Sequence, residues 1–200
     1  VVRLDGVSAT AGEWRQLEDG TWLWSLVIRS KGAVGQRVHI GRLSVPDGAE
    51  CYLYNAGQPN EVYGPLESGE DFWTPTCFGE SVVIECHLSS DEQKASLALV
   101  VDKTIHVYRE LTSLPWTKAV GACNIDSTCY PDWSVQASGV GGIGTIGIVG
   151  SLWCTGSLVV DRDPSTQIPY FLTANHCVGN AARADTIEVY WLYQTDECDG

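Results

Sequence analysis

The chain has 200 residues, of which 44% are hydrophobic, enough for one large core or two small ones. Its 25 acidic and 12 basic residues give a formal net charge of −13, which repels phosphate backbones and anionic lipid, so nucleic acid is excluded as an expected partner. No apolar run approaches the roughly 20 residues of a membrane-spanning helix, so we expect no membrane span. The chain begins VVRLDG and has no methionine, which indicates a processed or excised piece.

Eight cysteines indicate disulfides and an oxidising compartment, because reduced cytosolic thiols are seldom so numerous. No two of them are spaced C-x2-C or C-x4-C, and the four histidines are dispersed, so a zinc site has no support in the sequence. We therefore expect a secreted protein, extracellular or periplasmic, with no metal and no cofactor.

The first half of the chain shows the alternation of half-buried β-strands. In residues 21–30, TWLWSLVIRS, four apolar side chains share one face at a period of two: Trp22, Trp24, Leu26 and Ile28. Further strands are predicted over residues 37–45, 50–54, 81–88, 95–101 and 104–108, with turn-rich segments between them. This pattern predicts an all-β domain over residues 1–109, a jelly-roll-like β-sandwich that serves as a pro- or accessory domain.

Residues 110–120, ELTSLPWTKAV, interrupt the alternation and contain a proline, which predicts an interdomain linker with its boundary near Lys118. Residues 121–200 then contain three β-type runs without a helical stripe between them: GVGGIGTIGIVGSLWCTGSLVV, PYFLTANHCV and IEVYWLYQT. These runs predict part of a β-barrel.

The most informative segment, FLTANHCV at 171–178, is an apolar strand that ends in a histidine followed directly by a cysteine. It resembles the TAAHC motif of trypsin-like serine peptidases. In that family the histidine is the general base, which makes His176 the candidate here, and a neighbouring disulfide restricts the movement of its ring. The resemblance implies that Cys177 pairs with Cys154.

Four segments in order resemble the lysyl endopeptidase branch of this superfamily: CNIDSTC at 123–129, WCTGSLV at 153–159, PYFLTANHC at 169–177 and VYWLYQTDEC at 189–198. The resemblance implies a second disulfide, Cys129 to Cys198. It also implies that Cys123 bridges to the C-terminal half of the peptidase, in a missing segment or in a second chain.

For the first domain the cysteine pairing stays open. Cys51, Cys77 and Cys86 are odd in number, which predicts one bridge and one free or intermolecular thiol. Aromatic side chains at Tyr52, Tyr54, Phe72 and Trp73 could form a binding face, although aromatic residues in strands more often pack inside.

The resembled family places its aspartate and serine after the histidine, and no GDSGG-like segment follows His176. Asp185, Asp196 and Asp199 are candidates for the orienting carboxylate, but they lie in sequence typical of solvated turns. Ser157 lacks the Gly-x-Ser-x-Gly turn of a nucleophile, so a structural role is expected. We expect this chain alone to be inactive, because the base is present without the nucleophile.

The function implied is a secreted serine endopeptidase that acts on protein or peptide substrates, after lysine or another basic residue. Cleavage after Lys118 would release from a zymogen a peptidase that begins AVGACNID. The alternative is a catalytically inactive, trypsin-like binding protein.

Overall fold

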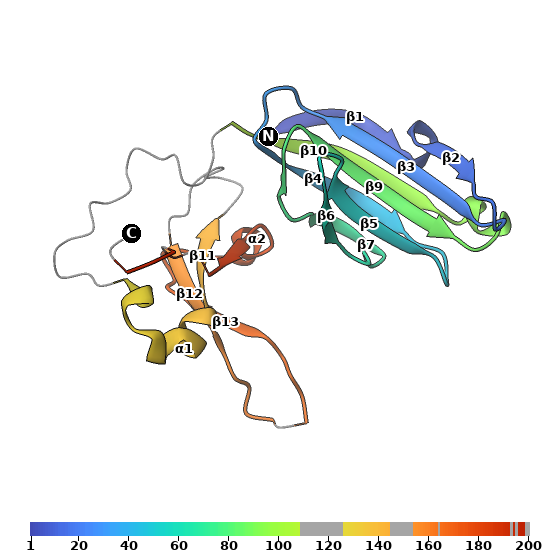
Figure 1. The fold of residues 1–200 in the computed structure, drawn as a ribbon. Coiled ribbons are helices and arrows are strands. Elements are labelled where there is room, and N and C mark those ends of the chain that lie inside the picture. Colours follow the sequence, from blue (N-terminus) through green and yellow to red (C-terminus); the bar gives the residue numbers. More distant parts are fainter. Residues whose placement is uncertain (109–125, 145–153, 164, 193, 195, 199–200) are drawn as a thin grey trace. The chain divides into compact units, whose positions relative to one another are not determined.

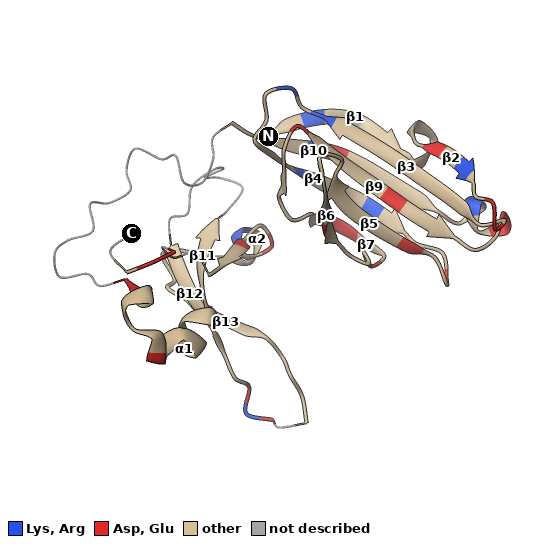
Figure 2. Ribbon diagram, viewed as in Figure 1, with Lys and Arg blue, Asp and Glu red and all other residues tan. Residues whose placement is uncertain are grey.

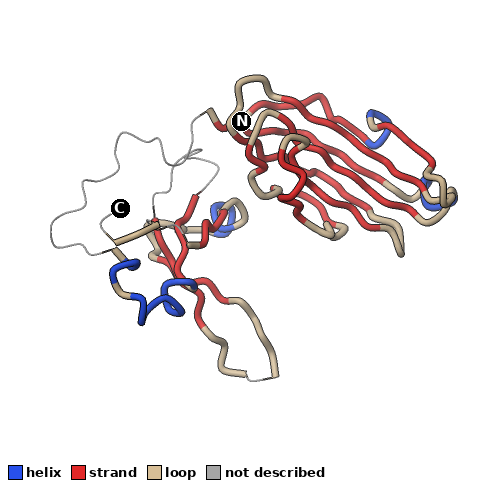
Figure 3. The backbone as a smooth tube through the Cα atoms, viewed as in Figure 1, coloured by secondary structure: helices blue, strands red, loops and turns tan. Residues whose placement is uncertain are grey.

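The computed structural model describes residues 1–108, 126–144, 154–163, 165–192, 194 and 196–198. The chain forms two compact units, Val1–Arg109 and Glu110–Gly200 (Figure 1). Over the described residues both are mostly β, as expected, with three antiparallel sheets and short helices (Figure 3). The predicted linker at 110–120, including Lys118, lies outside the described residues. Nowhere in the described ranges is a helix long and apolar enough to cross a membrane.

The N-terminal unit contains two sheets. The first has the order β1-β10-β4-β7, with β8 also paired to β4, and consists of β1 Val2–Ser8, β4 Gly35–Ser44, β7 Gly69–Trp73, β8 Cys77–Phe78 and β10 Ala98–Val107. The second has the order β2-β3-β9-β5-β6 and consists of β2 Glu13–Gln16, β3 Trp22–Arg29, β5 Glu50–Asn55, β6 Gln58–Tyr63 and β9 Ser81–Leu88. Two 3-10 turns, η1 Ala9–Ala11 and η2 Glu92–Ala95, complete the unit.

One core joins the two sheets. Its buried members come from both of them, for example Val38 and Ile40 on β4 and Leu53 on β5, all 0% exposed. Each such side chain contributes about 1.5–3 kcal/mol by leaving water. The face predicted for residues 21–30 is confirmed, because its four apolar side chains belong to or pack against this core.

A disulfide between Cys51 and Cys86 joins β5 to β9 at directly opposed positions in the core. The sequence left this pairing open. Cys77, the third cysteine of the unit, is buried on β8.

The prediction of separate strands at 95–101 and 104–108 is wrong, since β10 is a single strand. Its pairing with β4 shifts register between Val101 and Lys103, so a β-bulge accommodates the polar residues there and no turn is needed. Strands β1, β2, β6, β7 and β8 are not predicted by the sequence pattern. They are short or rich in polar residues, and all four residues of β2 are exposed, so they show no clear alternation.

The C-terminal unit contains one four-stranded sheet in the order β13-β12-β11-β14. Its elements are η3 Ser127–Cys129, η4 Pro131–Trp133, α1 Ser134–Ser138, β11 Val140–Gly144, β12 Cys154–Val159, β13 Tyr170–Thr173, α2 Ala181–Ala184 and β14 Glu188–Trp191. The strands in the described ranges form no closed barrel. The sequence pattern predicts no helix between the β-type runs, but α2 makes one helical turn between β13 and β14.

Candidate active site

Glycines in the two central strands of the C-terminal sheet make room for aromatic rings from the outer strands. Gly141 on β11 and Gly156 on β12 lie directly opposite each other. A Cβ atom at Gly156 would lie 2.6 Å from Cζ of Phe171 and 2.7 Å from the Leu172 carbonyl oxygen. A Cβ atom at Gly141 would clash with Cγ1 of Val189 on β14 and lie 3.2 Å from the ring of Trp191. Phe171 and Trp191 meet edge to face above these glycines, with ring centroids 5.7 Å apart.

The connection from β12 to β13 is held by two aspartates. Asp161 accepts hydrogen bonds from the backbone N–H of Ile168 at 2.9 Å and from the Thr166 hydroxyl at 2.8 Å, and these bonds lower the pKa of Asp161. The hydroxyl and N–H of Ser165 lower the pKa of Asp163 in the same way. The ionised carboxylates therefore fix the loop that aligns β13 with β12.

His176 lies in a tight turn directly after β13. The Ala174 carbonyl accepts from the N–H of Cys177 at 2.9 Å and of Val178 at 3.3 Å, which closes the turn. The Thr173 hydroxyl donates to the Thr155 carbonyl at 2.8 Å and fastens the end of β13 to β12. The backbone on the N-terminal side of His176 is thus fixed at two points.

A disulfide between Cys154 and Cys177 fixes the turn on its other side. Cys177 is buried, whereas His176 is exposed. One ring nitrogen of His176 and the sulfur atoms of the two cysteines all lie within 4.8 Å of one another. The imidazole therefore projects to solvent from a turn whose backbone is covalently anchored to the sheet.

This group of one histidine and two cysteines does not fit a metal ion. A metal binds the thiolate form of cysteine, and both sulfur atoms are already joined to each other. His176 is then the only ligand of the three.

Neither of the two carboxylate candidates that the structure describes, Asp185 and Asp196, bonds to His176. Asp185 is the exposed C-cap of α2, Asp196 is also exposed, and Asp199 lies outside the described residues. Within the part of the chain that the structure describes, no hydrogen bond or ion pair joins His176 to a carboxylate. Ser157 sits within β12, opposite Leu172 on β13 and Val140 on β11, which is a structural position in a sheet.

Two further cysteines of the unit, Cys129 and Cys198, form a disulfide that spans 69 residues. This pair and Cys154–Cys177 are those that the family resemblance implies. Cys123 lies outside the described residues.

A single helical turn, α2, follows the histidine and is not among the elements predicted from the sequence. Asn180 accepts a hydrogen bond from the Arg183 N–H at 2.9 Å and caps α2. An asparagine directly before the alanine-rich stretch AARA is the sequence signal that predicts this cap.

Comparisons with known proteins place both units in one class, the lysyl endopeptidases. The lysyl endopeptidase N-terminal domain matches residues 5–108, and the lysyl endopeptidase C-terminal domain matches residues 117–200. The chain belongs to the lysyl endopeptidase family. A lysyl endopeptidase of Pseudomonas aeruginosa is 27% identical over 214 residues, which cover 97% of this chain and 45% of that protein. The chain thus spans about half the length of this relative. No solved structure matches the chain.

Proposed function

We propose that this chain is the histidine-bearing part of a secreted serine endopeptidase, in which His176 is the general base. The observation that carries the proposal is the fixed and exposed position of His176 beside the Cys154–Cys177 disulfide. A general base must reach the hydroxyl of the nucleophile within hydrogen-bond distance, so a covalently anchored turn favours proton transfer. The aspartate and the serine come from a C-terminal half outside these 200 residues.

Exposed apolar side chains support a missing half. Trp133, Leu172 and Val160 of the C-terminal unit are 61%, 63% and 94% exposed. Large apolar residues left exposed in this way are typical of surfaces that another part of the protein covers. In this proposal the described sheet is part of the first barrel of a trypsin-like fold, the remainder of the peptidase packs on it, and Cys123 bridges to that remainder.

The substrate class and the processing follow from the family. We propose cleavage after lysine in protein or peptide substrates, and release of the peptidase from a zymogen by cleavage after Lys118. The N-terminal unit is then a pro- or accessory domain, with the jelly-roll topology expected of it. Its disulfide and those of the C-terminal unit support an extracytoplasmic location.

The test uses the full-length protein that contains this chain. Hydrolysis of a peptidyl-lysine p-nitroanilide is compared between the parent protein, His176→Ala and Asp185→Asn. Loss of the general base should lower kcat by about 10⁴- to 10⁶-fold. Asp185→Asn is the matched control, and it should keep the parent activity because Asp185 caps α2 and does not contact His176.

Two results would overturn the proposal. His176→Ala with the activity of the parent would remove the histidine from the mechanism. A parent protein that neither hydrolyses the substrate nor reacts with a fluorophosphonate probe would favour the inactive binding protein. Intact mass measured with and without reductant then tests the Cys123 bridge, which predicts release of a second polypeptide if the linked halves have been separated by cleavage.

A further inference from the structure

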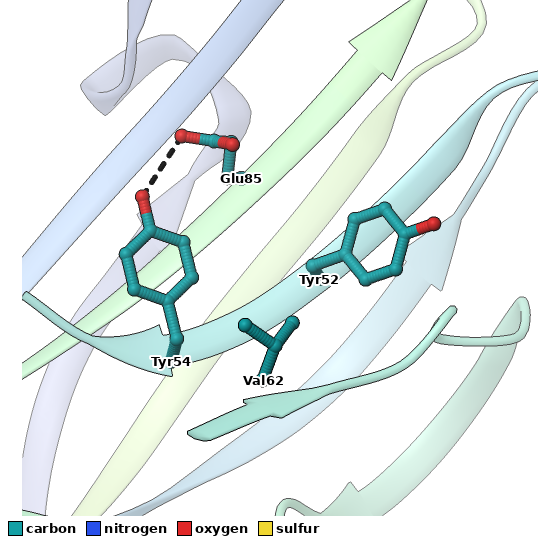
Figure 4. A pocket seen from close by; sticks show the side chains of 4 residues that line it. All are labelled: Tyr52, Tyr54, Val62 and Glu85. Atoms are coloured by element: carbon teal, nitrogen blue, oxygen red, sulfur yellow. Dashed lines mark hydrogen bonds between the residues drawn. The ribbon is translucent and has the colours of Figure 1, made fainter. Parts of the chain in front are cut away.

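A pocket of about 300 Å³ lies on the N-terminal unit, on the face of the second sheet that points away from the core (Figure 4). It is lined by Tyr52, Tyr54, Val62 and Glu85. The residues come from three neighbouring strands, β5, β6 and β9, and the register places Tyr52 opposite Glu85 and Tyr54 opposite Val62. The pocket is part of the unit itself and does not depend on the proposed peptidase function.

Strand alternation explains why these side chains gather outside the core. On β9 the residues Ile84 and Cys86 are buried in the core, so Glu85 between them points to the other face. On β5 the residues Cys51 and Leu53 are buried, which turns Tyr52 outward. Figure 2 shows acidic positions on β5 and β9, two of the strands that form the pocket.

Both tyrosine hydroxyl groups of the pocket already donate a hydrogen bond to a carboxylate. Tyr54 Oη donates to Glu85 Oε2 at 2.9 Å, and Tyr52 Oη donates to Glu50 Oε2 at 2.7 Å. Burial and the Glu85 carboxylate raise the pKa of Tyr54 to about 12, and the hydrogen bond to Glu50 raises the pKa of Tyr52, so both phenols stay protonated at neutral pH. With these protons committed, the phenol and carboxylate oxygens can only accept further hydrogen bonds.

The charge of the pocket favours a cation. Glu85 is partly buried, with a side chain 22% exposed. Its Oε2 accepts from Tyr54 and its Oε1 lies 2.9 Å from Nε2 of the half-exposed His87, so a bound cation shares this carboxylate with both groups. None of the four lining residues is a lysine or an arginine. Two aromatic rings beside a carboxylate attract an ammonium or guanidinium group, and Val62 offers an apolar surface to the methylene stem that carries such a group.

The position of the pocket favours a polypeptide as the source of that cation. Val62 belongs to β6, the edge strand of the sheet. The edge of a sheet is a template on which an extended peptide can align its backbone. A peptide that lies along β6 can direct one side chain into the pocket.

We propose that the pocket formed by Tyr52, Tyr54, Val62 and Glu85 binds the basic side chain, lysine or arginine, of an extended peptide. The ammonium or guanidinium group donates to Glu85 and to Tyr54 Oη, and the stem packs on Val62 and the ring of Tyr52, whose hydroxyl points away from Glu85 (Figure 4). A single anchored side chain predicts weak binding, with a dissociation constant of about 1 mM.

The experiment is a two-dimensional NMR titration of the ¹⁵N-labelled 200-residue chain with the peptide acetyl-Gly-Ala-Lys-Ala-Gly-amide. Saturable shifts should be confined to amides of β5, β6 and β9. The same peptide with norleucine in place of lysine keeps the stem without the charge, and it should cause no saturable shift. Glu85→Gln should weaken binding of the lysine peptide about tenfold or more.

Two variants complete the design. Glu13→Gln is the matched control, because Glu13 is an exposed acid on β2, the opposite edge strand of the same sheet, and does not line the pocket. If the pocket and not the overall charge is responsible for binding, Glu13→Gln should change the dissociation constant by less than about twofold. Val62→Lys places a cation at the pocket, and it should abolish binding even if Glu85→Gln does not fold. Val62 is 50% exposed, so this change is tolerated by the fold.

Equal binding of the norleucine peptide, or unchanged binding by both pocket variants, would overturn the proposal. Saturable shifts of the same amides with a neutral oligosaccharide, and none with the lysine peptide, would assign the pocket to carbohydrate instead. These results leave the peptidase proposal untouched, because none of them involves the C-terminal unit.

Discussion

Replacing Gly156 by alanine should loosen the sheet that carries His176. The new Cβ would lie 2.6 Å from Cζ of Phe171 and 2.7 Å from the backbone oxygen of Leu172. The phenyl ring can rotate away, but the carbonyl oxygen can move only if β13 moves. Overpacking of this kind costs about 1–3 kcal/mol, which corresponds to an opening equilibrium raised by about 5- to 160-fold.

Hydrogen exchange of the full chain, followed by mass spectrometry, measures this opening locally. Peptides that cover β12 and β13 should exchange faster by the same factor, whereas peptides of the N-terminal unit should be unaffected. Gly139→Ala is the control, because its Cβ would meet no atom closer than the Gln136 carbonyl oxygen at 3.6 Å. If both variants exchange at the parent rate in β12 and β13, the close contact between these strands does not constrain the site.

Two further predictions concern the N-terminal unit. Burial raises the pKa of Asp102, but the hydrogen bonds and charges of His39, at 2.5 Å, and of Lys103, at 3.3 Å, outweigh it and bring the pKa below the usual 3.8. Ionised Asp102 therefore stabilises the fold at pH values above its usual pKa. Urea unfolding should show a lower free energy of unfolding for Asp102→Asn than for the parent at pH 7, and this difference should shrink as the pH falls below about 4. An equal difference at pH 7 and pH 3 would contradict this. Replacing Cys51 and Cys86 together by alanine opens a disulfide that spans 35 residues and should lower the free energy of unfolding by about 4 kcal/mol. An unchanged urea midpoint in the double variant would show that the bridge adds nothing to the folded state.

The parts of the fold that could be predicted are those in which burial repeats along the chain. Strand β9 was predicted with its observed bounds, Ser81–Leu88, because apolar residues alternate through it and pack on the core. The bulge in β10 could not be predicted, because the two polar residues Asp102 and Lys103 are typical of a turn. Only the pairing with β4 shows that the strand continues through them. Strand β7 has the same difficulty, because GEDFW shows a strand only through its pairing with β4.

The four aromatic residues proposed as one binding face lie on two different sheets. Tyr52 and Tyr54 do line a pocket, but Phe72 packs against the core and Trp73 lies beside His39 on the other sheet, with ring centroids 4.8 Å apart. Glu85 completes the pocket and is not among the residues predicted to form it. Its position between two core residues of β9 was the available signal, and the register with β5 was the missing information.

The candidate active site shows the same division between local and distant information. The position of His176 at a strand end beside a cysteine is local, and the sequence carries it in eight residues. The packing of β13 depends on residues distant in the sequence. Gly141 and Gly156 are 15 residues apart and look like interruptions of an apolar run. They lie side by side beneath Phe171 and Trp191 only because β11 pairs with β12. Glycine in a strand interior weakens the strand unless another group occupies the space. At Gly156 that group is the ring of Phe171, and at Gly141 it is the side chain of Val189 together with the ring of Trp191. The strand that leads into the His176 turn therefore rests on a contact between β12 and β13 that no single segment encodes, and the Gly156→Ala variant tests that contact directly.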